Sequence, residues 1–173
     1  YRGPSPIPYT VLRGETRSGF TVIRLNERID SGDIIFQEPV ALPAEITAPE
    51  LTELMARLVA AKLLDLLDQI EQNKVTFTAQ NDAARSYAPL LTKADGLIDW
   101  SSDAGTIHNR IRALQPWPSA YSFYNGVLIK FFRSVVLPAH EASRAAAPGT
   151  IVALDAAGAV QVQTGTSCIG LLE

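Results

Sequence analysis

The stretch that decides the fold is TAPELTELMARLVAAKLLDLLDQIEQN, residues 47–73, because it carries the strongest helix signal in the chain. Thr47 and Glu50 have the spacing of a capping box, and Pro49 falls in the first turn, where its missing N–H does no harm. The apolar residues recur mostly at steps of three and four, which predicts one apolar stripe along an amphipathic helix. They are Leu51, Leu54, Met55, Leu58, Leu66, Leu67 and Ile70. We therefore expect a helix that ends near Asn73 and packs through this stripe.

Upstream of this helix, two segments rich in β-branched and aromatic residues predict strands. They are FTVIRL, residues 20–25, and DIIFQEPVAL, residues 33–42. The stretch YTVLRGE, residues 9–15, predicts a short helical turn that ends near Gly14. Two strands followed by a long helix indicate an α/β arrangement for the first half of the chain.

Downstream of the helix, residues 74–97 lose the periodicity and predict a linker that crosses to a second unit. Residues 101–114 then predict a shorter helix, with Ser101 or Ser102 as its cap. Its apolar side would consist of Ile107, Ile111 and Leu114, with Arg110 and Arg112 projecting elsewhere.

Beyond this second helix the chain changes to an all-β pattern. Asn125-Gly126 lies between two apolar runs, which is the strongest short-range signal for a β-hairpin. Three further strand-like runs follow, GTIVALD (149–155), AVQVQT (159–164) and SCIGLLE (167–173). About five short strands at close spacing predict a small barrel or sandwich.

Composition sets limits on the class of protein. The chain has 173 residues, of which 47% are apolar, enough for one ordinary domain or two small ones. Its net charge of −3 gives no general attraction to nucleic acid or anionic membrane, and charged residues interrupt every apolar stretch before it could span a bilayer. The one cysteine, Cys168, excludes an internal disulfide framework, and the isolated His108 and His140 predict no metal site. The chain opens without Met on a Pro-rich segment and stops within a strand-like run, so we expect a piece of a longer protein.

The loop between the two predicted strands contains RIDSGDII, residues 28–35, in which Asp30 and Asp33 flank a Ser-Gly pair. Asp, Ser and Gly are the residues of a tight turn, so local chemistry alone favours a structural role. A carboxylate that takes part in catalysis is the alternative, and the residues of the loop do not decide between the two.

Charge is more informative locally than over the whole chain. Between residues 110 and 144, Glu141 stands against five basic residues, which are Arg110, Arg112, Lys130, Arg133 and Arg144. The interleaved aromatic residues are Trp117, Tyr121, Phe123, Tyr124, Phe131 and Phe132. A basic small barrel with aromatic side chains is a common platform for nucleic acid, and a solvated strand face over an aromatic core is the equally weighted alternative.

Three long motifs carry a family resemblance. YRGPSPIPYTVLRGETRSGFTVIRLNERIDSGDII (1–35) resembles the run YRG-x-x-P-I … NGE-x-x-T-G-V-T-I … D-x-G-D of methionyl-tRNA formyltransferases. SYAPLLTKADGLIDW (86–100) and IRALQPWPSAY (111–121) resemble the interdomain and early C-terminal signatures of that family. The resemblance covers nearly the whole chain, and the last two motifs are the more specific to it.

The resemblance implies a fold and an activity. The implied fold is the last part of a Rossmann-like α/β catalytic domain (1–80), a linker (81–97) and an OB-like β-barrel that binds tRNA (98–173). The implied reaction transfers a formyl group from 10-formyltetrahydrofolate to the amino group of methionyl initiator tRNA, in translation initiation. The resemblance also implies a monomer when intact, in the bacterial cytoplasm or an organellar matrix, without a metal and without binding to DNA or membrane.

The resemblance further assigns roles to residues. Asp30 matches the Asp of a catalytic Asn, His and Asp trio, whose Asn and His would lie before residue 1, so we expect this segment alone to be inactive. The folate would lie against the loop residues, with Gly32 close to the pterin and Asp33 holding the loop. These loop residues are Ile29, Asp30, Ser31, Gly32 and Asp33. The residues expected to contact tRNA phosphates are Arg110, Arg112, Lys130 and Arg133.

Two alternatives stay open. One is a 10-formyltetrahydrofolate-dependent formyltransferase that acts on an amino-sugar nucleotide, which shares the loop and a similar barrel. The other is a non-catalytic RNA-binding module.

Overall fold

A computed structural model describes residues 1–138, 145–154 and 158–172, so His140 and Arg144 lie outside the described residues. The chain forms two compact units. The first contains residues 1–10 and 15–90, and the second contains residues 11–14 and 91–173. Within the described ranges, no helix combines the length and the apolar character that crossing a membrane would need.

The first unit contains an antiparallel β-hairpin, β1 (Arg17–Ile23) and β2 (Ile34–Ala41), in which Phe20 pairs with Glu38. This confirms the two expected strands, although β1 begins and ends earlier than residues 20–25. The helix α1 (Pro6–Leu12) precedes the hairpin and begins three residues before the expected turn. It begins there because a proline is tolerated in the first helical turn, where its N–H has no helical partner.

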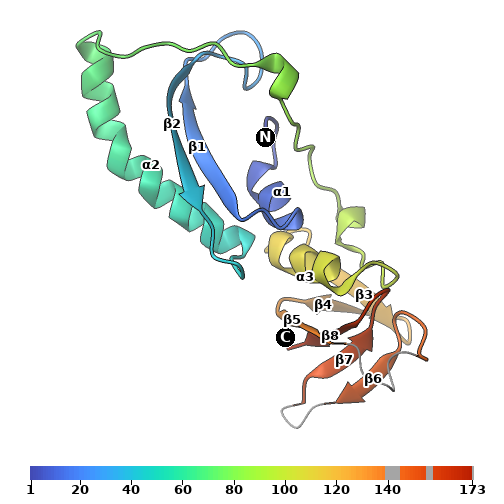
Figure 1. Cartoon of the computed structure of the whole chain (residues 1–173). Helices are drawn as coiled ribbons and strands as arrows, with labels where there is room; N and C mark the ends of the chain where they lie inside the picture. Colours follow the sequence, from blue (N-terminus) through green and yellow to red (C-terminus); the bar gives the residue numbers. More distant parts are fainter. Residues whose placement is uncertain (139–144, 155–157, 173) are drawn as a thin grey trace. The chain divides into compact units, whose positions relative to one another are not determined.

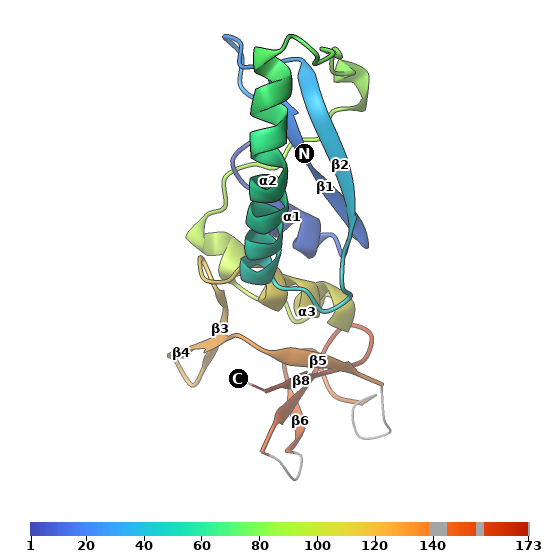
Figure 2. The ribbon, with the colours of Figure 1, turned by 90° about the vertical axis from the view of Figure 1, so that its left-hand side faces the viewer.

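The long helix α2 (Ala48–Glu71) lies along the hairpin (Figures 1 and 2). Its predicted capping box is confirmed, since the Thr47 hydroxyl accepts from the Glu50 N–H and the Glu50 carboxylate accepts from the Thr47 N–H. Leu51, Met55 and Leu66 are buried as expected.

The expectation that the apolar stripe of α2 is packed along its whole length is wrong for the last turns. Leu67 is 50% exposed and Ile70 is 38% exposed, and the neighbouring Leu64 is 74% exposed. The two-stranded hairpin covers only part of this 24-residue helix, so that Leu66 is buried while its neighbours are exposed. The helix therefore presents an apolar surface, which we call the α2 face and define as Leu63, Leu64, Leu67 and Ile70.

The segment after α2 is irregular, as its lost periodicity predicts, and it returns along the hairpin loop. Thr78 exchanges two backbone hydrogen bonds with Ile34, at 2.8 and 3.0 Å. Arg2 donates its N–H to Ser86 and accepts from the Ala88 N–H. Residues 78–88 therefore form part of the first unit; they contain one short 3-10 turn, η1 (Asp82–Ala84). The domain boundaries near residues 80 and 98 stay predictions.

From residue 91 onward, the second unit contains another 3-10 turn, η2 (Lys93–Gly96), and then the helix α3 (Ala104–Ala113). Ile107, Ile111 and Leu114 are buried, which confirms the expected apolar side of α3. The expected cap is wrong, because Asp103 caps the helix and accepts from the Thr106 N–H at 2.8 Å. The Ser101 hydroxyl is instead held by the Asp99 carboxylate in the preceding turn.

Six strands follow in the described part of the second unit. β3 (Ala120–Tyr124) and β4 (Val127–Phe131) form a hairpin around Asn125-Gly126, whose positive φ angles of 50° and 80° confirm the predicted turn. The other four form one antiparallel sheet in the order β5-β8-β7-β6, from β5 (Ser134–Leu137), β6 (Ile151–Leu154), β7 (Val160–Gln163) and β8 (Cys168–Leu171). Strand β5 was not expected. The described strands form these two sheets, so the closed OB-like barrel stays a prediction.

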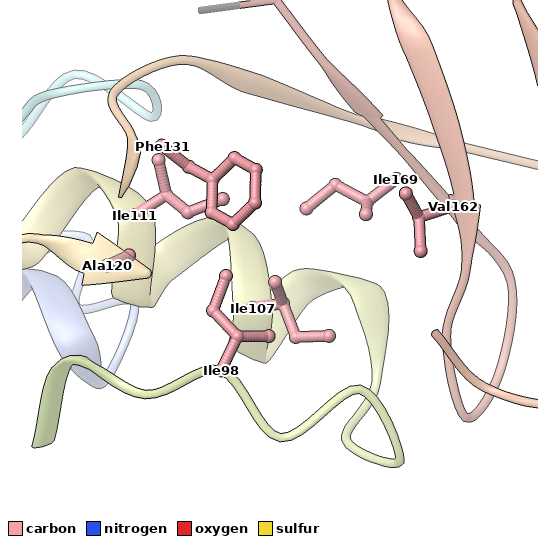
Figure 3. Close-up of a cluster of buried hydrophobic side chains, with 7 residues drawn as sticks. All are labelled: Ile98, Ile107, Ile111, Ala120, Phe131, Val162 and Ile169. Atoms are coloured by element: carbon pink, nitrogen blue, oxygen red, sulfur yellow. The ribbon is translucent and has the colours of Figure 1, made fainter. Parts of the chain in front are cut away.

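The core of the second unit joins α3 to both sheets. Figure 3 shows Ile107 and Ile111 of α3 pointing toward Phe131 of the hairpin, with Val162 and Ile169 of the four-stranded sheet beside them. Trp100 packs edge-on against the Phe131 ring, with centroids 6.0 Å apart. This core fixes the position of the outward side chains on α3 and β4.

Candidate functional site

The loop between β1 and β2 is closed by its own backbone and side chains. The Arg24 N–H donates to the Asp33 carbonyl at 2.8 Å, which joins the two ends of the loop. Inside the loop, the Asn26 side-chain oxygen accepts from the Arg28 N–H and from the Ser31 hydroxyl. These local bonds are those of an Asx turn and explain the Asn and Ser in the loop.

Asp30 lies at the tip of this loop in an unusual backbone conformation. Its φ of 52° is in the left-handed region, which Asp and Asn tolerate better than most side chains. One oxygen of its carboxylate, Oδ2, accepts from the Gly3 N–H at 2.8 Å. The residue is exposed, so an external group can reach the carboxylate. The structure thus brings together the Asp of the loop and the Tyr-Arg-Gly motif of residues 1–3, which the sequence separates by 27 positions.

Two glycines make this approach possible. A Cβ on Gly32 would lie 1.6 Å from the Arg24 carbonyl oxygen, so no larger residue fits where the loop closes on itself. Gly3 has a φ of 108°, and a Cβ there would lie 2.6 Å from the Ala88 carbonyl oxygen. Ile29, by contrast, is 85% exposed beside Asp30 and offers an apolar surface next to the carboxylate.

Gln80 ties the loop to the start of the chain, a role that the sequence analysis missed. Its Nε2 donates to the carbonyls of Asp30, at 3.0 Å, and of Gly32, at 2.6 Å. Its Oε1 accepts from Nε and Nη2 of Arg2, at 3.0 and 2.8 Å. Arg2 also pairs with Asp82 at 2.8 Å. No local pattern marks a Gln that bonds residues about fifty and eighty positions away, so no signal in the sequence could have found it.

The basic residues of the second unit divide into exposed and buried ones. Lys130 on β4 and Arg133 are exposed. Arg110 is half-buried and donates from Nη1 to the Asp95 carbonyl in η2. The carboxylate of Asp95 accepts from the hydroxyl and the N–H of Thr92, and these bonds lower its pKa.

The expectation that Arg112 projects away from the buried side of α3 is wrong. Arg112 is 8% exposed, and its Nη2 donates to Oδ1 of Asn109. The reason is that β5 packs against this side of α3. His108, one turn before Arg112, is buried on the same side, and its imidazole Nδ1 lies 2.9 Å from the hydroxyl of Ser134 on β5. Because the sequence pattern did not predict β5, this second buried side of α3 was not expected.

An aromatic pair lies beside Lys130. Tyr121 on β3 is the cross-strand partner of Lys130, and its ring meets Phe123 edge-on at 5.9 Å. Tyr121 also lies against Gly96, the residue after the Asp95 to which Arg110 donates. Since Phe123 is 58% exposed, this surface combines cationic and aromatic groups in the way that nucleic-acid platforms do.

Comparison with known proteins identifies the family. Residues 1–67 match the family model described as formyl transferase, and residues 90–173 match the model described as formyl transferase, C-terminal domain. The chain belongs to the formyl transferase family. Its similarity to the methionyl-tRNA formyltransferase of Syntrophus aciditrophicus is 39% identity over 171 residues, which is 99% of this chain and 54% of that protein. The chain thus spans about half the length of the curated relatives that it matches.

Solved structures share the fold, and two of them are named as formyltransferases. The methionyl-tRNA formyltransferase from Clostridium thermocellum matches 79% of this chain and 58% of its own, with a TM-score of 0.60 and 22% identity. The N-formyltransferase of Helicobacter canadensis, solved with folinic acid and dTDP-3-aminofucose, matches 99% of this chain and 61% of its own, with a TM-score of 0.74 and 18% identity. HypX from Aquifex aeolicus, solved with tetrahydrofolic acid, matches 98% of this chain and 29% of its own, with a TM-score of 0.75 and 20% identity. The α/β part followed by a strand-rich part is therefore the formyl transferase fold.

Proposed function

We propose that this chain is the part of a methionyl-tRNA formyltransferase that carries the catalytic Asp and the tRNA-binding domain. The proposed reaction moves the formyl group of 10-formyltetrahydrofolate to the amino group of methionine on initiator tRNA. The observation that carries the proposal is Asp30, whose exposed carboxylate is held on one oxygen by the Gly3 N–H at the tip of a closed loop. The curated relatives named methionyl-tRNA formyltransferase, at 35–40% identity, support the tRNA acceptor.

The chemistry suits a carboxylate held in this way. The amine nucleophile must lose a proton as it attacks the formyl carbon, and a carboxylate that orients a base or a water molecule assists that step. One oxygen of Asp30 is used by Gly3, which leaves the other oxygen for such a partner. The Asn and His that the family resemblance implies would stabilise the oxyanion. We propose that Ile29 to Asp33 line the folate.

We propose that the second unit positions the tRNA through phosphates. Arg110, Lys130 and Arg133 are the candidate contacts, and Arg112 is left out because it is buried. The Tyr121–Phe123 pair beside Lys130 offers a stacking surface for an unpaired base. Phosphate contacts of this kind set position and affinity rather than sequence preference. The remaining parts of the proposal are a monomeric protein of the bacterial cytoplasm or an organellar matrix, and an OB-like barrel.

The test compares Asp30→Asn with Asp33→Asn in the natural full-length protein. Asn tolerates the left-handed backbone and can still accept the Gly3 N–H, so Asp30→Asn removes the charge and preserves the shape. We expect its turnover rate to fall by about 10²–10⁴, the usual contribution of a general acid or base. Asp33→Asn is expected to lower the turnover rate far less, because the backbone carbonyl of Asp33 closes the loop and its carboxylate does not.

The same assay separates the alternatives when the acceptor is changed. Formyl transfer to methionyl initiator tRNA, with none to a dTDP-amino sugar, supports the proposal. Transfer to the sugar nucleotide alone would assign the chain to the sugar-modifying branch, to which the Helicobacter canadensis structure belongs by its ligands. Wild-type turnover in both Asp variants would leave the loop as a turn without a catalytic role.

A further inference from the structure

The side-chain amide of Gln80 has all its hydrogen-bonding capacity engaged. A glutamine amide offers two N–H donors and two acceptor lone pairs. The donors reach the carbonyls of Asp30 and Gly32, and the oxygen receives two bonds from Arg2. Only one orientation of the amide is possible, because Arg2 can only donate and the two carbonyls can only accept.

The placement of Gln80 is itself enforced. Two backbone bonds between Thr78 and Ile34 hold the chain next to the end of the loop, two residues before Gln80. On the other side, the Arg2 backbone is bonded to Ser86 and Ala88. Gln80 therefore lies between the loop and the start of the chain, each of which is anchored.

The loop has few other ties to the rest of the first unit. Among the described residues, its other hydrogen bonds, from Asn26, Ser31 and the Arg24–Asp33 closure, lie within the loop. The Gly3 N–H reaches the Asp30 carboxylate, and Arg24 stacks on Phe77 with its guanidinium 5.3 Å from the ring centroid. Gln80 therefore bonds to the backbone on both sides of Ser31, and one of these two bonds is to the carbonyl of Asp30 itself.

We propose that Gln80 is a positioning residue for the formyl transfer: it fixes the backbone of the Asp30 loop and aligns the Asp30 carboxylate with the Gly3 N–H. This inference rests on the proposed catalytic role of Asp30. Gln80 touches neither the formyl donor nor the amine in this proposal. Arg2 fixes the Gln80 side chain through its two bonds to the amide oxygen.

Gln80→Glu tests the proposal with the least change of shape. The carboxylate can still accept both bonds from Arg2, but it has no N–H for the loop and sets a negative oxygen against two carbonyls. Gln37→Glu on β2 is the matched control. The Gln37 amide donates to the Thr21 hydroxyl at 2.9 Å, and a hydroxyl can reverse its bond and donate to the new carboxylate. Both variants add one charge to the first unit.

Two measurements are made on each variant in the natural full-length protein. The first is turnover with saturating 10-formyltetrahydrofolate and methionyl initiator tRNA. We expect Gln80→Glu to lower kcat by about ten- to a hundred-fold, since a small displacement of a catalytic group has an effect of that size, while the KM for tRNA stays unchanged. The second is amide hydrogen exchange, in which Gly3 and Arg24 are expected to exchange about tenfold faster while the β1–β2 ladder is unaffected. Gln37→Glu is expected to match the wild type in both.

A combined variant distinguishes positioning from general stability. If Gln80 acts through Asp30, adding Gln80→Glu to Asp30→Asn lowers kcat little further, because residues that act as a unit are not additive. Equal fold-losses in both backgrounds would overturn the inference. Wild-type kcat in Gln80→Glu, with Asp30→Asn slow, would overturn it while leaving the proposed function intact. Wild-type turnover in Asp30→Asn would instead refute the proposed function itself.

Arg2→Lys serves if Gln80→Glu does not fold. Lysine keeps a positive charge near Asp82 but cannot form the paired bonds to the Gln80 oxygen. We expect faster exchange at Gly3 and Arg24 and a smaller drop in kcat than for Gln80→Glu. Unchanged exchange and unchanged kcat in Arg2→Lys would contradict a role for the Arg2–Gln80 pair.

Discussion

Ile111 holds the helix that carries Arg110, and its replacement gives the sharpest test of the core of the second unit. Its side chain is 0% exposed within the cluster that joins α3 to both sheets. Ile111→Ala removes three buried carbons at about 0.8 kcal/mol each, so the transfer term is about 2.4 kcal/mol. Because a rigid cluster closes a cavity only in part, we expect a loss of about 3–4 kcal/mol in the free energy of unfolding, within the usual range of about 2–5 kcal/mol. Ile111→Val is expected to cost about 1 kcal/mol.

The assay is urea unfolding followed by tryptophan fluorescence. The two tryptophans of the chain, Trp100 and Trp117, both belong to the second unit, so their emission reports that unit alone. Trp100 is the more sensitive probe because it packs against the cluster. Ile129→Ala is the matched control, since it makes the same deletion on β4 at a side chain that is 39% exposed. We expect the control to cost less than about 1 kcal/mol.

Equal shifts of the urea midpoint in Ile111→Ala and Ile129→Ala, with unchanged slopes, would contradict this expectation. Such a result would mean that Ile111 is not packed as the structure has it, and that α3 is held by other contacts. A value for Ile111→Val as large as that for Ile111→Ala would point to overall loosening rather than to a local cavity.

The other predictions concern charge, association and pH. Lys130→Ala should weaken tRNA binding and reduce the slope of log K against log salt by about one unit. The control Arg57→Ala on α2 should leave that slope unchanged. An unchanged slope in Lys130→Ala, Arg110→Ala and Arg133→Ala alike would contradict the proposed phosphate contacts. This chain on its own should self-associate through the α2 face, and Leu67→Lys should reduce that association; a monomer at all concentrations in ultracentrifugation would contradict it. Hydrogen bonds from the Thr106 hydroxyl and N–H lower the pKa of Asp103. Their contribution to the free energy of unfolding is therefore complete above about pH 4 and is lost as the pH falls through the lowered pKa. Asp103→Asn keeps the helix cap, so its Tm should fall less steeply than that of the wild type below about pH 4; equal slopes would show that the carboxylate contributes nothing.

Signals that lie within a few residues of one another predicted much of the local structure. The capping box at Thr47 and Glu50, the apolar steps of α2 and α3, and the Asn125-Gly126 turn each depend on contacts between near neighbours in the chain. Such contacts form in any context that keeps the segment helical or turned, which is why the sequence predicts them. The motifs around Asp30 and in residues 86–121 also identified the family by resemblance, and the comparisons agree.

What the tertiary structure alone decided is which distant groups meet and which side chains are covered. Asp30 and Gly3 are 27 residues apart and Gln80 lies 50 residues beyond Asp30, so their contacts depend on the path that residues 74–88 take. Arg112 is buried because β5 packs over a second side of α3, and Leu67 is exposed because a two-stranded hairpin covers only part of α2. A side chain is buried only where another part of the chain packs over it, and the pattern of one segment does not show what packs over it. The sequence therefore determined most of the elements and the family, while the folded chain determined strand β5 and the surroundings of each candidate residue.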